Sequence, residues 1–129
     1  MVALQEVRWK GRGEHKEGNM TLLYSGNDRI HTHGVGFLLG KRAMATLLDF
    51  KTINDRLATI RLRSRWFNMT IINGYAPTDA SEDQQKNAFY EKLQEVIDST
   101  PRWDVTILLG DFNAKIGKET HTFAPAITA

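Results

Sequence analysis

The sequence contains no cysteine, which excludes disulfide bonds and thiolate metal sites and is compatible with a reducing compartment. It also lacks any apolar run near the ~20 residues that cross a bilayer. Charged residues follow residues 1–4 so closely that the apolar region of a signal peptide does not fit. We therefore expect an intracellular protein without a membrane segment.

Several common ligand-binding motifs are missing as well. The chain has no Walker-type glycine loop, no dinucleotide fingerprint and no nucleophile elbow, which argues against the enzyme classes that depend on them. No internal repeat or linker divides the 129 residues, so we expect one modest domain. A formal charge of +2 permits a polyanionic partner without requiring one.

The most informative stretch is a run of branched apolar residues, 105–109, that leads into Gly110, Asp111, Phe112 and Asn113. Such a run predicts a buried strand that delivers polar groups at its carboxyl end. A carboxylate beside a carboxamide suits phosphate chemistry with a divalent metal. Asp111 would position the metal or take a proton from water, and Asn113 would donate a hydrogen bond to an oxyanion. A plain strand-to-turn junction is the alternative.

Hydrophobic periodicity divides the rest of the chain into strands and two helices. Polar, glycine-containing stretches predict loops, of which the longest covers residues 8–19. A capping-box sequence that begins at Ser81 opens an amphipathic helix that runs to Ile97 and stops before Pro101. The predicted strands cover residues 1–7, 20–24, 34–39 and a run over 50–78 that turns at 63–65, and a short helix covers 41–48.

Two further polar side chains follow predicted strands. Glu6 is either a metal ligand or an exposed glutamate at a strand end. Tyr75 either presents its hydroxyl to a ligand or plugs the end of the sheet. Because a strand–helix–strand crossover runs from Tyr75 to Asp111, we expect both residues at one edge of one sheet.

Two other clusters have simpler interpretations. His31 and His33 would share one face of a strand, but they lie beside a turn without an obvious third ligand, which favours a solvated loop over a metal site. The second cluster is either a basic and aromatic surface for nucleic acid or, more simply, a solvated strand face with a hairpin turn. Its members are Arg61, Arg63, Arg65, Trp66 and Phe67.

Three segments together resemble the endonuclease/exonuclease/phosphatase superfamily. They are Leu4-Gln5-Glu6, Asn73-Gly74-Tyr75-Ala76-Pro77 and Gly110-Asp111-Phe112-Asn113-Ala114. The residues around Trp9, Tyr24, His33 and Arg56 are similar to those of RTE/BovB-type non-LTR retrotransposon endonucleases and of craniofacial development protein 2-like proteins. The resemblance covers residues 1–118 as a partial domain and leaves 119–129 as an unpacked tail.

The resemblance implies an α/β (α+β) fold that is part of a four-layer sandwich, with two mixed β-sheets and outer helices. It also implies metal-dependent hydrolysis of phosphodiester bonds in DNA, with Mg²⁺ or Mn²⁺ as cofactor and a nuclear location. Glu6 and Asp111 would ligate the metal, and Asp111 would also deprotonate the attacking water. Tyr75 would contact the scissile phosphate and Asn113 would hold it.

The sequence departs from the family pattern at both ends. The family has an Asn on an earlier strand and a downstream Asp and Asp-His pair, and His121 does not match that pair. We therefore expect a fragment in which nicking is weak or absent and in which an uncovered sheet edge permits self-association. One alternative is a phosphatase or sphingomyelinase that acts on smaller phosphoesters. Another is a non-catalytic relic or interaction module that retains half of the fold.

Overall fold

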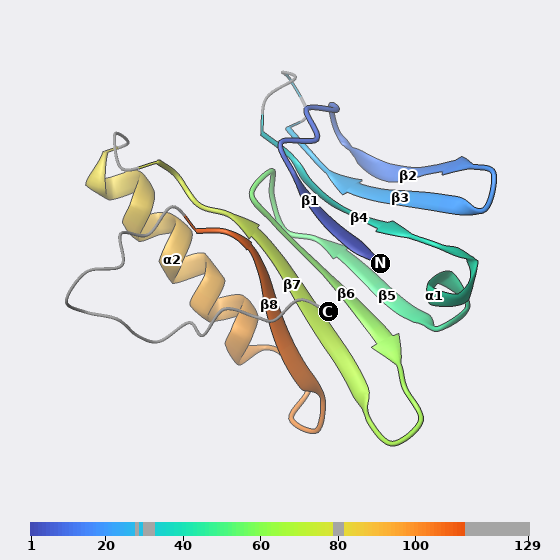
Figure 1. Ribbon diagram of the computed structural model, residues 1–129. Helices are drawn as coiled ribbons and strands as arrows, with labels where there is room; N and C mark the ends of the chain where they lie inside the picture. The colour runs from blue at the N-terminus through green and yellow to red at the C-terminus, as the bar shows by residue number, and fades with distance from the viewer. Residues whose placement is uncertain (28, 30–32, 79–81, 113–129) are drawn as a thin grey trace.

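A computed structural model of the chain describes residues 1–27, 29, 33–78 and 82–112. These residues form two four-stranded sheets and two helices, which confirms the predicted α+β class (Figure 1). The strands are β1 (Val2–Gln5), β2 (Arg12–Glu17), β3 (Met20–Ser25), β4 (Val35–Leu39), β5 (Leu47–Thr52), β6 (Leu57–Arg63), β7 (Asn68–Tyr75) and β8 (Val105–Asp111). The helices are α1 (Lys41–Ala45) and α2 (Asp83–Asp98), and neither has the length and apolarity needed to cross a membrane.

The first sheet, with strand order β1-β4-β3-β2, is antiparallel throughout, and the second, β5-β6-β7-β8, is mixed. The expectation of two mixed sheets is therefore correct for one sheet only. The physical reason is that parallel neighbours need a long crossover, and within the described residues only α2 provides one, between β7 and β8.

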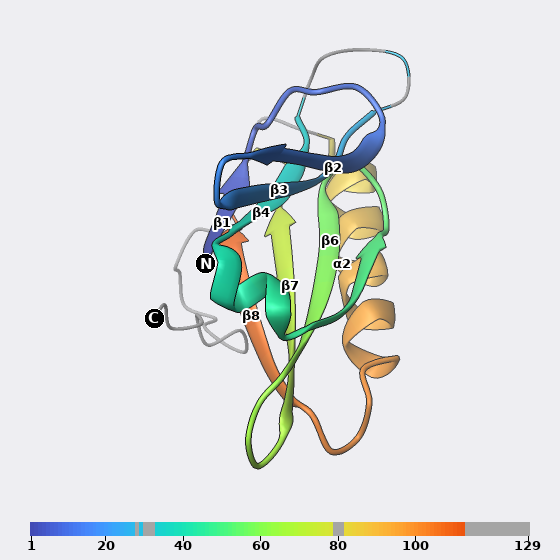
Figure 2. The same ribbon diagram turned by 90° about the vertical axis from the view of Figure 1, so that its right-hand side faces the viewer.

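The two sheets face each other, and α2 covers the other face of the second sheet, so the described chain has three layers (Figures 1 and 2). Alternate residues of β6 and β7 therefore enter two separate cores. The core between the sheets contains Leu23, Val35, Phe37, Leu39, Ala58, Ile60, Leu62 and Ile71. The core under the helix contains Leu57, Ile72, Ala76, Phe89, Leu93 and Val96.

Two predicted elements are wrong. Residues 8–19 are not simply a loop, because β2 pairs along its whole length with β3. The side chains of β2 are mostly exposed, and main-chain hydrogen bonds hold this edge strand in place. Its sequence therefore lacks the apolar alternation that predicts a strand. The predicted helix over 41–48 stops at Ala45, because Leu47 pairs with Leu62 of β6 and sheet pairing overrides a weak local helical propensity.

The strand–helix–strand unit is confirmed, and so is the hairpin, although its turn covers residues 64–67 because Arg63 still pairs with Asn68. Helix α2 begins at Asp83, after Glu82, which makes no side-chain capping hydrogen bond, so the helix starts one residue later than a helix capped by Ser81 would. Ser81 itself lies outside the described residues, as do the domain boundary at 118 and the tail 119–129.

Strands β1 and β8 each have one described neighbour, and their edges flank a largely apolar cleft of about 600 Å³. Apolar side chains of both sheets line this cleft, among them Ala3, Met69 and Ile107. Self-association through this edge stays a prediction.

The side chain of Asn73 is fully buried and joins the two sheets. Its Oδ1 accepts a hydrogen bond from Gln5 Nε2, and its Nδ2 donates to the carbonyl oxygens of Leu4 and Gly36, each at 2.8 Å. Asn73 belongs to β7, whereas its three partners belong to β1 and β4. A buried amide with all of its partners fixes how one sheet sits on the other.

Replacement of Asn73 by alanine should strongly destabilise the fold. The Asn73→Ala change leaves one buried donor and two carbonyl groups without their partner, and each such loss costs ~1–3 kcal/mol. We expect the free energy of unfolding, measured by urea denaturation, to fall by about 3 kcal/mol or more. Asn68→Ala in the same strand is the control, with an expected change within ~0.5 kcal/mol. Equal losses in the two variants would contradict the bridging role.

Gly110 has a steric role within the second sheet. Its φ is +137°, and a Cβ atom at this residue would overlap the carbonyl oxygen of Gly74 in the neighbouring strand. The missing side chain therefore makes room for the backbone of β7.

A Gly110→Ala variant should lose more than about 2 kcal/mol of unfolding free energy, because backbone strain and a clash with main-chain atoms add together. Gly18→Ala separates the two effects: Gly18 also has a positive φ, of 59°, but a Cβ atom added there would meet nothing within 4 Å. We expect Gly18→Ala to cost about 1 kcal/mol. Similar thermal transitions for both variants would show that the contact with Gly74 is unimportant.

Candidate functional site

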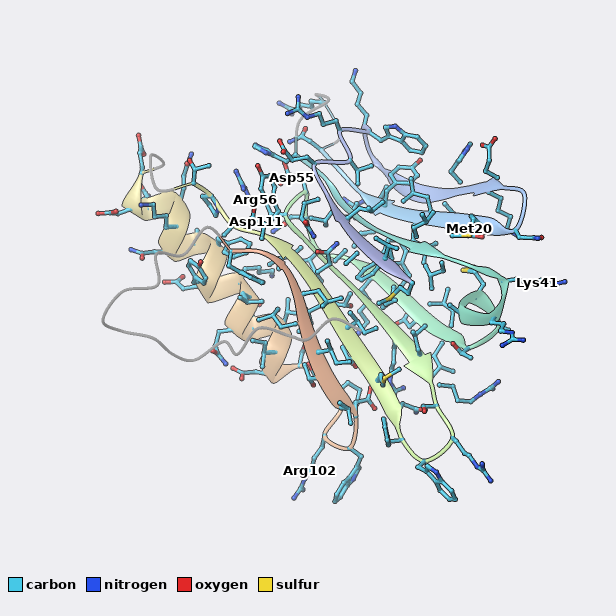
Figure 3. The ribbon with its side chains drawn as sticks, in the orientation of Figure 1. Met20, Lys41, Asp55, Arg56, Arg102 and Asp111 are labelled. Atoms are coloured by element: carbon cyan, nitrogen blue, oxygen red, sulfur yellow. The ribbon has the colours of Figure 1, made fainter. Side chains whose placement is uncertain are left out.

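Three of the residues that the sequence singled out lie at one end of the molecule. Tyr75 and Asp111 end the parallel strands β7 and β8 and are register partners. Glu6 directly follows β1, which contacts both of these strands. Figure 3 shows Asp111 toward the same end of the sandwich as Asp55 and Arg56. The predicted fourth member, Asn113, lies outside the described residues.

The phenol of Tyr75 is influenced by both carboxylates. Burial is the largest cause that raises the pKa of Tyr75, and the negative charge of Glu6 raises it further. The guanidinium of Arg56 lowers this pKa, whereas a hydrogen bond with Glu6 and the charge of Asp111 raise it. The structure therefore brings Glu6, Tyr75 and Asp111 within electrostatic reach of one another.

Arg56 and His33 complete the surroundings of Tyr75, although the sequence pattern did not select either of them as a site residue. The Arg56 guanidinium lies 5.3 Å from the centre of the Tyr75 ring, and its Nη1 donates to the Tyr75 carbonyl oxygen at 2.9 Å. The His33 and Tyr75 ring centres are 5.9 Å apart. His33 Nε2 lies 3.4 Å from Arg56 Nη2, which fits a hydrogen bond when the ring proton is on Nδ1. His31 lies outside the described residues.

The backbone at this end is strained. Glu6, Arg8 and His33 have φ angles of 54°, 60° and 53°, a left-handed conformation that costs other residues ~1–2 kcal/mol relative to glycine. The Arg8 amide donates to the His33 carbonyl oxygen at 2.7 Å, so two of the strained residues hold each other. Such conformations concentrate at functional sites. Glutamate and arginine do not signal a positive φ, so the sequence could not reveal this feature at Glu6 or Arg8.

A cleft of about 450 Å³ lies on the side of α2, next to Arg56 and His33. It shares His33 and Arg56 with the group around Tyr75 and also includes Asn27 and Asp55. Arg8 forms an ion pair with Glu6 at 2.9 Å. Together with Arg56, it is the second arginine at this end of the molecule. An arrangement of carboxylates beside guanidinium groups suits a ligand that combines an anion with a cation, such as a metal-bound phosphate.

The described residues fit a divalent metal only in part. They contain no group of three or more His, Asp or Glu side chains arranged to hold an ion. Mg²⁺ usually binds proteins through one or two carboxylates and completes its octahedral shell with water and substrate phosphate oxygens. Glu6 and Asp111 are the two carboxylates that the sequence assigns to such a site.

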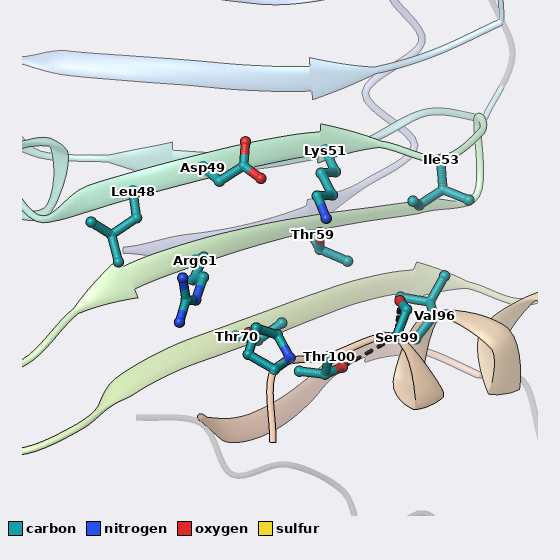
Figure 4. A pocket seen from close by; sticks show the side chains of 11 residues that line it. Leu48, Asp49, Lys51, Ile53, Thr59, Arg61, Thr70, Val96, Ser99 and Thr100 are labelled. Carbon is teal, nitrogen blue, oxygen red and sulfur yellow. Dashed lines mark hydrogen bonds between the residues drawn. The ribbon is translucent and has the colours of Figure 1, made fainter. Parts of the chain in front are cut away.

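A second hollow, of about 320 Å³, lies on the outer face of the second sheet beside the end of α2 (Figure 4). Arg61 lines it, but this guanidinium is bound to the Asp104 carboxylate through contacts of 2.7 and 2.8 Å. Thr70 also donates to Asp104, at 2.7 Å. These bonds fix the loop before β8, which indicates a structural role for this hollow.

Comparison with known proteins supports part of the resemblance. No model of a known protein family matches the chain. The chain is 33% identical over 119 residues to craniofacial development protein 2 of Bos taurus and 32% identical over 119 residues to that of Tragulus javanicus. It is a partial homologue of craniofacial development protein 2. The match covers 92% of this chain but only 20% and 21% of those proteins, so the chain spans about a fifth of their length.

The raised pKa of Tyr75 gives a test of this geometry. Tyr75 should titrate above the ordinary value of about 10, and Glu6→Gln should lower its pKa because it removes a negative charge. The absorbance of tyrosinate, compared with Tyr75→Phe, measures this change. Folding raises the pKa of Tyr75, and the stability linked to this shift is fully present below the pKa of Tyr75 in the unfolded chain. It is lost as the pH rises through the higher pKa of Tyr75 in the folded protein.

Glu91→Gln, the same change on the exposed face of α2, is the control for Glu6→Gln. It should leave the Tyr75 titration unaltered. If Glu6→Gln also leaves the titration unaltered, the two side chains are not neighbours in solution.

Proposed function

We propose that the chain binds a DNA phosphodiester together with a divalent metal at the Tyr75 end and hydrolyses it slowly. The observation that carries this proposal is that Tyr75 and Asp111 are register partners at the ends of β7 and β8, and that Glu6 follows β1, which contacts both strands. The order of these residues in the chain matches the endonuclease/exonuclease/phosphatase pattern that the sequence resembles. The homology to craniofacial development protein 2 supports the narrower part of that resemblance.

Each side chain has a role that its surroundings allow. Glu6 and Asp111 would hold Mg²⁺, which supplies Lewis-acid activation of the phosphate when it is bound. The Tyr75 phenol is protonated at neutral pH, as its raised pKa requires, and would donate a hydrogen bond to a phosphate oxygen. Arg56 lies against the Tyr75 ring and supplies positive charge beside it. Asp111 would accept the proton of the attacking water, and Asn113 is assigned to the phosphate by the resemblance alone.

A binding module without catalysis is the second candidate. The observation that favours it is that the described residues contain no cluster of three metal-ligating side chains. General acid and base groups each contribute ~10²–10⁴-fold to a rate. A site that holds the phosphate without the full set of such groups would bind DNA and leave it intact.

The test is nicking of supercoiled plasmid DNA by the 129-residue chain in the presence of Mg²⁺. We expect slow nicking that chelation abolishes and that Asp111→Asn and Glu6→Gln each reduce by roughly 10²-fold or more. Glu91→Gln should nick at the unchanged rate. DNA binding by the same variants, measured by gel shift, separates the two candidates.

Binding without any metal-dependent nicking would identify the non-catalytic module. Nicking that persists in Asp111→Asn and Glu6→Gln would refute the assigned site. Thermal melting of each variant checks that a lost activity does not come from unfolding.

A further inference from the structure

Two loops lie side by side at the opposite end of the molecule from Tyr75 and Asp111. One is the turn between β6 and β7, residues 64–67, and the other joins α2 to β8, residues 99–104. The strands that follow them are parallel neighbours, with Met69 paired to Val105, so the loops are adjacent (Figures 1 and 2). Figure 3 shows Arg102 at this end, far along the strands from Asp111.

Each loop exposes a tryptophan that is stacked by the preceding arginine. Trp66 is 81% exposed and Trp103 is 82% exposed, the largest values among the exposed hydrophobic side chains of the described residues. The Arg65 guanidinium carbon lies 5.0 Å from the Trp66 ring centre, and that of Arg102 lies 5.2 Å from the Trp103 ring centre. We call these four residues the Trp–Arg tip. Each indole keeps most of its surface open to a ligand.

The charge of the tip is positive. Arg63 is also exposed, at the end of β6, so it adds a third arginine to the two that the loops carry, Arg65 and Arg102. The only acidic side chain in residues 64–67 and 99–104 is Asp104, which is 3% exposed and bound to Arg61 and Thr70. No exposed carboxylate in these loops neutralises the arginines, and the network around Asp104 fixes the base of the Trp103 loop.

Packing does not explain these side chains. Single exposed hydrophobic residues are normal on protein surfaces, but here two tryptophans occupy adjacent loops and each is paired with its own cation. Exposed indoles beside guanidinium groups provide stacking surfaces for bases and positive charge for phosphates. In a duplex the base faces are already stacked, so a single strand is the form that offers them.

We propose that the Trp–Arg tip binds single-stranded nucleic acid, with bases stacked on Trp66 and Trp103 and phosphates held by Arg65 and Arg102. A lipid surface fits less well, because each indole carries a guanidinium on its ring face that must stay hydrated. The tip lies roughly 20–25 Å along the strands from the Tyr75 end, given a rise of ~3.3 Å per residue. The proposal is therefore independent of the hydrolysis proposed there.

The experiment is fluorescence anisotropy of a labelled oligothymidylate of about 12 nucleotides, titrated with the 129-residue chain. We expect Trp66→Ala and Trp103→Ala each to weaken binding by about tenfold. Trp9→Ala is the matched control, because Trp9 is 40% exposed and packs against Tyr24 on the first sheet. This control should bind like the unaltered chain. Arg65→Ala and Arg102→Ala should each reduce the salt dependence of binding.

Comparison of ligands tests the chemistry. An oligouridylate arm distinguishes RNA from DNA, and either strand supports the proposal if the two tryptophan variants bind it more weakly. Equal binding of an abasic oligonucleotide or of a duplex would overturn it, since neither offers free base faces. Unaltered affinity in Trp66→Ala and Trp103→Ala would overturn it as well, as would binding to phosphatidylserine vesicles that the oligonucleotide does not compete away.

Discussion

The arrangement of the two sheets depends on one buried amide. The sheets are joined by side-chain packing, which is not directional, whereas the Asn73 hydrogen bonds to Gln5, Leu4 and Gly36 are directional. These bonds connect β7 to β1 and β4 just before the residues of the candidate site. Glu6 follows Gln5, and Tyr75 lies two residues beyond Asn73. The hydrogen bonds of the Asn73 amide therefore set the position of the Glu6 carboxylate relative to the Tyr75 phenol.

The parallel pairing of β7 with β8 gives the molecule two ends of different chemistry. Both strands run in one direction, so their carboxyl ends bring Tyr75 and Asp111 together, while their amino ends bring together the loops of Trp66 and Trp103. The first end combines carboxylates with arginines and strained backbone, and the second combines exposed indoles with arginines alone. The chemistry of each end differs because acidic side chains are present at one and buried in an ion pair at the other.

Much of the fold was accessible to sequence reasoning because its signals are local. The alternating burial of β3 and the helical spacing of α2 each arise from one buried face, whereas the apolar residues of β6 and β7 are buried on both faces of their sheet. Strand β2 and the start of β5 gave no such signal, because main-chain pairing with β3 and β6 holds them. At the site, Glu6, Tyr75 and Asp111 were accessible because each follows a strand. Arg56 and His33 were not, since their loops meet only in three dimensions.

The sequence by itself determined the α+β class, the crossover from Tyr75 to Asp111 and the residue types available for phosphate chemistry. Only the tertiary structure decided how those residues are used. It placed Gly110 against the Gly74 carbonyl, forced Glu6, Arg8 and His33 into left-handed conformations, and bound Arg61 to Asp104 while Arg65 and Arg102 lie over exposed indoles. The physical reason is that contacts between distant segments determine backbone strain, burial and charge pairing. None of these properties produces a periodic pattern in the sequence.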